Sequence, residues 1–217
     1  MNMQVKISRH QKILYEVWDA ITHGLGFIVS AGLGAALLVK AVRDGLNGIQ
    51  ITSLVVYLVS LLGLYLASTL FHCFVFTKAK RVFQIIDHSN IFILIAGTYT
   101  PYCLVFIHNT AGNWLLASVW VLALAGIALH IFSHGKHQRL ETTIYVVMGW
   151  LCLLLAKSLY ANLGTAGFWL LVSGGVTFTT GALIYSLPKS PELLHLIWHF
   201  FVMGGTTLMF LSIYLNV

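Results

Sequence analysis

The chain has 217 residues, of which 59% are hydrophobic and only 8% are charged. About a quarter of the residues in a soluble domain are charged, so this composition excludes an ordinary soluble protein and predicts a membrane protein. The net charge of +6 does not indicate nucleic-acid binding, because the basic residues form short clusters between apolar segments and match no nucleic-acid-binding motif. We expect a single domain over residues 1–217, since no linker or internal repeat divides the chain.

Seven segments of the chain have the roughly 20 mainly apolar residues that a membrane-spanning helix needs. In chain order they are residues 18–40, 51–72, 84–107, 113–133, 142–160, 165–186 and 193–215. The first segment follows a basic stretch, as a secretory signal does, but its length and its six similar successors favour a true span. The predicted fold is therefore an all-α, polytopic bundle of seven transmembrane helices.

The positions of Lys and Arg predict the orientation of this bundle, because cytoplasmic loops carry an excess of both residues. With a cytoplasmic N-terminus, nine basic residues lie inside: Lys6, Arg9, Lys12, Lys78, Lys80, Arg81, Lys136, Arg139 and Lys189. Only Lys40, Arg43 and Lys157 then lie outside. We therefore expect a cytoplasmic N-terminus and an external C-terminus.

Ionisable residues within the predicted spans are candidates for function, because such residues are costly in a membrane. Nearly all of them lie at the predicted cytoplasmic ends of their helices: Asp19, His23, His72, Asp87, His88, His130, His134, His195 and His199. Interfacial anchors placed at random would occupy both faces of the membrane. The asymmetry therefore predicts one site near the cytoplasmic face.

The spacing of the histidines points to a metal. His195 and His199 lie four residues apart, so they share one helix face and could hold one ion. His72 could add a third nitrogen, and Asp87 an oxygen, directly or through a bound water. Three histidines with an open fourth position are typical of catalytic zinc, which generates a nucleophile at neutral pH. The alternative for His195 and His199 is a pair of core histidines bonded to helix carbonyls.

A second pair of histidines has the same spacing but a different context. His130 and His134 lead directly into the polar loop 134–139. This context favours an interfacial or pH-responsive role over a metal-binding one. The spacing of four residues is therefore a weak signal by itself.

Four short motifs follow one another along the chain, each on a different predicted helix. They are Glu16-x-x-Asp19-x-x-Thr22-His23-Gly24-x-Gly26, Ser68-x-x-x-His72, Asp87-x-x-x-Ile91 continuing to Gly97-Thr98-Tyr99-Thr100-Pro101, and His195-x-x-x-His199. Together they resemble the progestin and adipoQ receptor superfamily, specifically its bacterial haemolysin III branch, over nearly the whole chain. The family pattern usually has Asn where this chain has Asp19, which adds a carboxylate beside the expected site.

The resemblance implies a zinc site formed by His72, His195 and His199, in which Asp87 holds a zinc-bound water as a catalytic residue. It also implies a catalytic role for Ser68 as an oxyanion partner or a supporting neighbour, although Ser68 could equally bond to its own helix. Asp19 and His23 would then lie just behind the ligands. The implied activity is that of a ceramidase-type hydrolase of a lipid amide or ester in the bacterial inner membrane.

Three other functions use the same residues differently. The first is a sensor or regulator of membrane lipids in which zinc ties the second, third and seventh helices together, with a membrane lipid or fatty-acid-containing molecule as its ligand. The second is a cytolysin, which is disfavoured because so apolar a chain could not be soluble before insertion. The third is an ion transporter, which would place polar residues at the membrane midplane rather than at one end.

Overall fold

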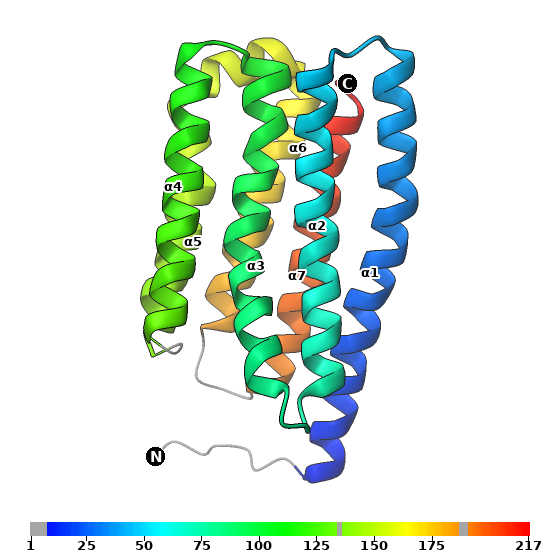
Figure 1. Cartoon of the computed structure of the whole chain (residues 1–217), viewed down its shortest axis with the longest axis vertical. Helices are drawn as coiled ribbons and strands as arrows, with labels where there is room; N and C mark the ends of the chain where they lie inside the picture. The colour runs from blue at the N-terminus through cyan, green and yellow to red at the C-terminus, as the bar shows by residue number, and fades with distance from the viewer. Residues whose placement is uncertain (1–7, 134–135, 187–190) are drawn as a thin grey trace.

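The computed structural model describes residues 8–133, 136–186 and 191–217 and shows a bundle of long helices along one axis (Figure 1). Within these residues there are seven α-helices: α1 (Arg9–Arg43), α2 (Gly48–Phe74), α3 (Lys80–Pro101), α4 (Thr110–Ser133), α5 (Gln138–Trp150), α6 (Ala156–Tyr185) and α7 (Pro191–Tyr214). A π-helical segment, η1 (Tyr102–Ile107), continues α3 beyond Pro101. A 3-10 segment, η2 (Leu151–Leu155), joins α5 to α6.

The helices confirm the predicted all-α, polytopic class. Six stretches of the described residues are long and apolar enough to cross a membrane: Arg9–Arg43, Gly48–Phe74, Lys80–Ile107, Thr110–Ser133, Leu140–Tyr185 and Glu192–Tyr214. Large apolar side chains cover the outside of the bundle, and Phe132 and Trp114 are 82% and 72% exposed. Such a surface matches lipid rather than water. The count of seven crossings and the orientation of the termini stay predictions.

The first helix begins nine residues before the predicted apolar span. Ser8 caps it: the Ser8 hydroxyl accepts a hydrogen bond from the Gln11 amide at 3.2 Å, and the Gln11 side chain accepts one from the Ser8 amide at 2.8 Å. This reciprocal capping satisfies two backbone donors at the helix start. Hydropathy cannot detect the true start of α1, because the first turns of this helix are polar.

The predicted break between residues 160 and 165 coincides with a non-helical residue within α6, Gly164 (φ 60°, ψ −178°), whereas α5 ends at Trp150, ten residues before the end of the predicted span 142–160. The two predicted spans there fall within one apolar stretch of 46 residues, Leu140–Tyr185. Tyr99 of α3 stabilises the end of α5. Its hydroxyl donates to the carbonyls of Met148 (2.8 Å) and Gly149 (3.0 Å) and accepts from the Cys152 amide (2.7 Å). A side chain from another helix thus satisfies backbone groups where the α-helix ends, which no local pattern reveals.

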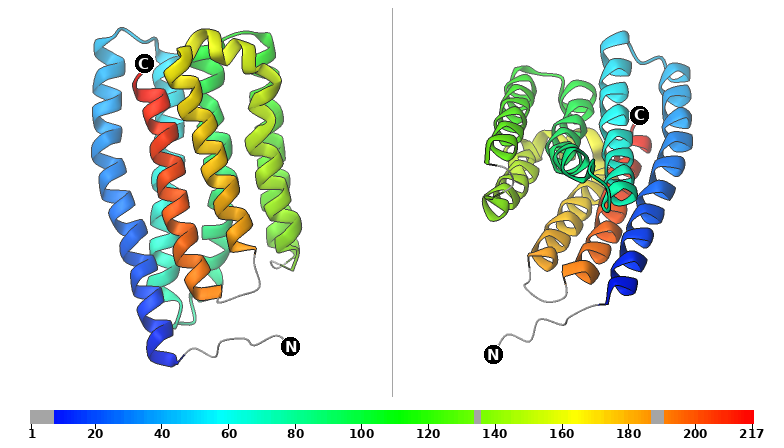
Figure 2. Two further views of the ribbon diagram at one scale, coloured as in Figure 1. Left: turned by 180° about the vertical axis from the view of Figure 1, so that it is seen from behind. Right: turned by 60° about the horizontal axis from the view of Figure 1, so that its bottom comes forward.

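Two groups of neighbouring helices position the site. α1 packs against α2 and α7 on one side of the bundle, whereas α4 and α5 lie on the other, with α3 contacting both α2 and α4 (Figures 1 and 2). The end of α2 and the beginnings of α1, α3 and α7 lie at the same end of the bundle (Figure 1). The polar residues predicted to converge from these four helices therefore share one end of the molecule.

Candidate metal centre

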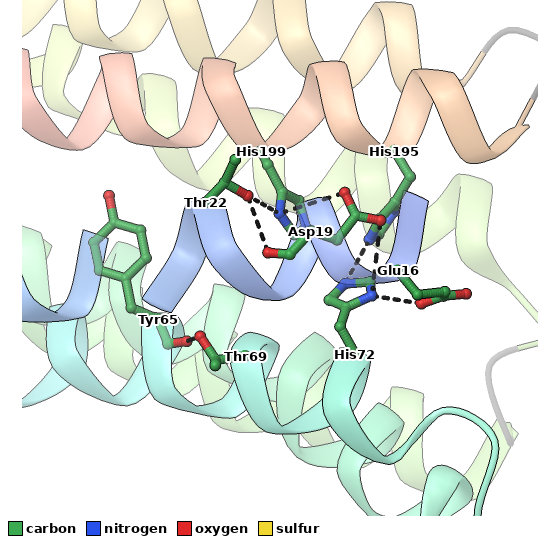
Figure 3. Close-up of polar contacts among 8 residues, drawn as sticks. All are labelled: Glu16, Asp19, Thr22, Tyr65, Thr69, His72, His195 and His199. Carbon is green, nitrogen blue, oxygen red and sulfur yellow. Dashed lines mark hydrogen bonds and ion pairs between the residues drawn. The ribbon is translucent and has the colours of Figure 1, made fainter. Parts of the chain in front are cut away.

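Three histidines meet between α2 and α7. His72 lies at the end of α2, and His195 and His199 occupy successive turns near the beginning of α7. One nitrogen from each ring lies within 4.8 Å of one nitrogen from each of the others, and the Nε2 atoms of His72 and His195 are 3.1 Å apart (Figure 3). His195 and His199 follow His72 by 123 and 127 residues along the chain. The structure thus brings together three predicted ligands that are distant in sequence.

The first helix orients His72 through a carboxylate. Nδ1 of His72 lies 2.8 Å from Oε2 of Glu16 and 3.8 Å from Oδ2 of Asp19 (Figure 3). Because a carboxylate only accepts hydrogen bonds, the hydrogen-bond network assigns the proton to Nδ1. The lone pair of Nε2 therefore points toward His195. A histidine that donates its second N–H to a carboxylate is the usual arrangement around a bound metal.

His199 is oriented in the same way by a hydroxyl of α1. The Thr22 hydroxyl donates to the backbone carbonyl of Asp19 at 2.9 Å, so it accepts from Nδ1 of His199 at 3.1 Å. This assignment again leaves Nε2 of His199 with a free lone pair. The ring of His23 stacks on that of His199, with centroids 3.6 Å apart and planes 7° from parallel.

The donor set fits a divalent metal ion such as zinc. His72 and His199 each have Nδ1 engaged and an unprotonated Nε2, and Nε2 of His195 lies 3.1 Å from Nε2 of His72. His72 and His199 are 5% and 1% exposed, so these nitrogens lie away from bulk solvent. Imidazole nitrogens are borderline ligands that suit zinc, iron, copper and nickel. The arrangement therefore shows a cluster that could hold a metal ion, and it leaves the metal's identity open.

Two carboxylates form a second group around His72. Glu16, Asp19 and His72 also have ligand atoms within 4.8 Å of one another. Asp19 is buried, its Oδ1 lies 3.8 Å from Nδ1 of His199, and within the described residues that oxygen has no hydrogen-bond partner. Asp19 and His23 therefore lie beside the histidines of the cluster. Their role there stays a prediction.

Asp87 and Ser68 face a cavity beside the histidines. Both side chains are buried, and both line the cavity. In the part of the chain that the structure describes, Asp87 does not belong to either close group of metal-binding side chains. It shares the cavity wall with His195 and His199 instead. This position agrees with a contact through water and gives no support for direct ligation.

The cavity has a volume of about 150 Å³ and extends along the bundle. Residues from Asp87 to Ile107 of α3 and η1 line it, a distance of about 30 Å at 1.5 Å per helical residue. Beyond the polar end the wall is mainly apolar, with Leu94, Leu115 and Leu171 among its residues. A narrow apolar cavity that begins at a polar centre is suited to a ligand with a polar head and an aliphatic chain.

Sequence reasoning missed the residues that orient the histidines. Glu16 and Thr22 belong to the first motif, and they lie three residues before and after Asp19 on the same helix face. That spacing is the signal that could have identified them. Their partners on α2 and α7, however, appear only in the folded chain.

The second histidine pair is described only at His130, which is buried. It is 3% exposed and its Nδ1 lies 3.0 Å from Oε2 of Glu141, and its interfacial or pH-responsive role stays a prediction. The ring of His88 lies beside it, with centroids 5.1 Å apart. His134 lies outside the described residues. No local pattern in the sequence linked His130 to a carboxylate eleven residues later.

Comparison of the sequence with known proteins shows the family of the chain. Residues 11–210 match the family model described as haemolysin-III related. The chain belongs to this family. It is 44% identical over 198 residues to the "Hemolysin-3 homolog" of Bacillus subtilis (strain 168), covering 91% of this chain and 92% of the relative. It is 40% identical over 203 residues to "Hemolysin-3" of Bacillus cereus, covering 94% and 92%.

A more distant similarity extends to animals. The chain is 26% identical over 212 residues to the human "Monocyte to macrophage differentiation factor", covering 95% of this chain and 86% of the relative. These matches confirm the resemblance to the haemolysin III branch of the progestin and adipoQ receptor superfamily. Together with the six membrane-capable stretches, they confirm a multi-pass membrane protein.

Proposed function

We propose that this haemolysin-III-related protein is a zinc-dependent hydrolase that acts on the amide or ester bond of a membrane lipid. The observation that carries the proposal is the continuity of the site: Asp87, Ser68 and two histidines of the buried cluster all line the mainly apolar cavity. A lipid whose aliphatic chain lies in the cavity would bring its head group to the histidines. Hydrolysis there would contribute to membrane lipid homeostasis.

Each side chain has a task in this proposal. His72, His195 and His199 would hold zinc, with the first and last oriented by Glu16 and Thr22. The chemistry that zinc would supply there is polarisation of a carbonyl group and activation of water at neutral pH. The Asp87 carboxylate would take up the proton released when water attacks the substrate carbonyl and return it to the leaving nitrogen or oxygen. The Ser68 hydroxyl, which lines the same cavity, would support that carboxylate.

The proposal includes a topology with seven crossings. Figure 2 shows the chain reversing at one end of the bundle between α5 and α6, which supports the division of the 46-residue stretch into two crossings. The excess of basic residues favours a cytoplasmic N-terminus, which would place the histidines near the cytoplasmic face of an inner membrane. The C-terminus would then be external.

A second candidate function rests on a different aspect of the same contacts. The histidines and the residues that orient them tie α1, α2 and α7 together at one end of the bundle (Figure 3). A metal ion held there would act as a structural clamp, and occupation of the cavity by a lipid would alter the packing of these helices. The protein would then be a non-enzymatic lipid sensor.

Metal content measured by mass spectrometry on the detergent-purified protein tests both candidates. We expect about one zinc per chain in the wild type and in a His130→Ala control, and none in the His195→Ala/His199→Ala variant. A wild-type protein that holds no zinc even after zinc is supplied would refute both functions. If zinc is present, hydrolysis of acyl amides and esters that is abolished by Asp87→Asn supports the enzyme. Zinc retention without hydrolysis favours the sensor.

A further inference from the structure

The cavity has a second polar feature, on α5. Glu141 lines the cavity and is 2% exposed, and its Oε2 accepts a hydrogen bond from Nδ1 of His130 on α4 at 3.0 Å. α4 and α5 lie on the side of the bundle away from α1 and α7 (Figures 1 and 2). Among the described residues, neither Glu141 nor His130 belongs to a group close enough to hold a metal. The pair is therefore a polar centre distinct from the histidine cluster.

The two oxygens of the Glu141 carboxylate differ in their hydrogen bonding. Oε1 of Glu141 is buried and has no hydrogen-bond partner within the described residues. The nearby Tyr145 hydroxyl, which also lines the cavity, donates to the backbone carbonyl of His88 at 3.2 Å instead. A buried carboxylate oxygen without a donor is unfavourable, and a donor group on a ligand in the cavity would remove that cost.

His130 determines which oxygen is free. Because its Nδ1–H donates to Oε2, the carboxylate is held in one orientation, with Oε1 left for another donor. His130 itself does not line the cavity. It acts as a positioning residue for Glu141.

We propose that Glu141 binds an O–H or N–H donor on the head group of the lipid whose aliphatic chain occupies the cavity. The inference rests on the proposed function only in taking the same cavity as the lipid site. A carboxylate accepts hydrogen bonds and donates none, so it selects for donor-bearing head groups. It disfavours free fatty acids, whose carboxylates carry the same charge, and fully substituted esters or ethers, which have no donor. The ligand class is therefore an aliphatic lipid with a hydroxyl, amide N–H or amine beside its chain.

Two aliphatic probes that cannot be hydrolysed test this inference. 1-Hexadecanol carries an O–H donor, and its methyl ether, 1-methoxyhexadecane, has the same chain without one. Their dissociation constants would be measured by calorimetry on the zinc-loaded, detergent-purified protein. We expect the wild type to bind the alcohol about tenfold or more tightly than the ether, as a hydrogen bond to a charged group predicts.

The variant Glu141→Leu removes both oxygens at similar volume and should abolish this preference. Its affinity for the ether should stay within about twofold of the wild-type value. Asp44→Asn, which removes a carboxylate from the exposed Lys40–Asp44 ion pair, should retain the preference and controls for net charge. His130→Gln should reduce the preference without abolishing it, since Glu141 then loses its fixed orientation.

The inference is wrong if Glu141→Leu keeps the preference, if it loses affinity for both probes equally, or if the wild type binds neither probe. These outcomes are separate from a failure of the proposed hydrolase, because the probes contain no scissile bond. Zinc-dependent hydrolysis with a preference independent of Glu141 would refute only the inference. A preference that depends on Glu141, in a protein without hydrolase activity, would refute only the hydrolase.

Discussion

The Glu16 side chain offers a direct test of the metal centre. The substitution Glu16→Gln keeps the size of the side chain but replaces the charged acceptor of His72 Nδ1 with a neutral amide. In the structure the accepting oxygen lies 2.8 Å from Nδ1, and the Glu16 side chain is 14% exposed. The interaction is therefore short and mostly shielded from solvent, which makes the charge of the acceptor important.

The expected effect is a loss of zinc affinity by a factor of about 10 to 100. Removing a hydrogen-bonding partner of a metal-bound histidine typically has an effect of this size. It corresponds to about 1.4 to 2.7 kcal/mol of binding free energy. Two physical causes contribute: the imidazole becomes a weaker donor to the metal, and a neutral hydrogen bond holds its ring less firmly than a charged one. Glu16 does not supply one of the three nitrogens, so the variant should still bind zinc.

Competition with a fluorescent zinc chelator measures this affinity in detergent solution. Asp44→Asn is the matched control, because it removes an exposed carboxylate elsewhere on the same chain and should leave the affinity unchanged. Thermal melting of the zinc-free proteins would show whether the variant is folded. An affinity of Glu16→Gln within about threefold of the wild type would refute the reasoning, since His72 would then not be held through Glu16 in the metal-bound protein.

Two further predictions concern stability. Tyr99→Phe should lower the free energy of unfolding by about 1 to 3 kcal/mol in denaturant titrations, because the Cys152 amide loses its acceptor. A loss below about 0.5 kcal/mol would mean that the end of α5 does not depend on this hydroxyl. The free energy of unfolding of Gly126→Ala should be lower than that of Gly32→Ala by about 1 to 3 kcal/mol. A methyl group at Gly126 would collide with the Phe92 ring, whereas no atom lies within 4 Å of a methyl group placed at Gly32. Equal melting temperatures for the two alanine variants would contradict the close packing of α3 against α4.

Much of the candidate site could be predicted because its chemistry is unusual for a membrane span. Histidines and carboxylates are conspicuous against apolar segments, and their shared position at one set of helix ends indicated convergence before any contact was known. The orientation of each ring could not be predicted in this way. It depends on Glu16 and Thr22 reaching His72 and His199 from another helix, and nothing in the linear order specifies which atoms meet.

The sequence by itself determined the class of the protein, the approximate positions of its helices and the three candidate metal ligands. Hydropathy and the cost of buried polar groups act locally, so they can be read from a single segment. The tertiary structure alone decided where α5 ends, how His130 pairs with Glu141, and that the metal centre adjoins an elongated cavity. Each of these depends on a contact between helices, because a backbone group, a carboxylate or an apolar wall finds its partner only once the bundle is packed.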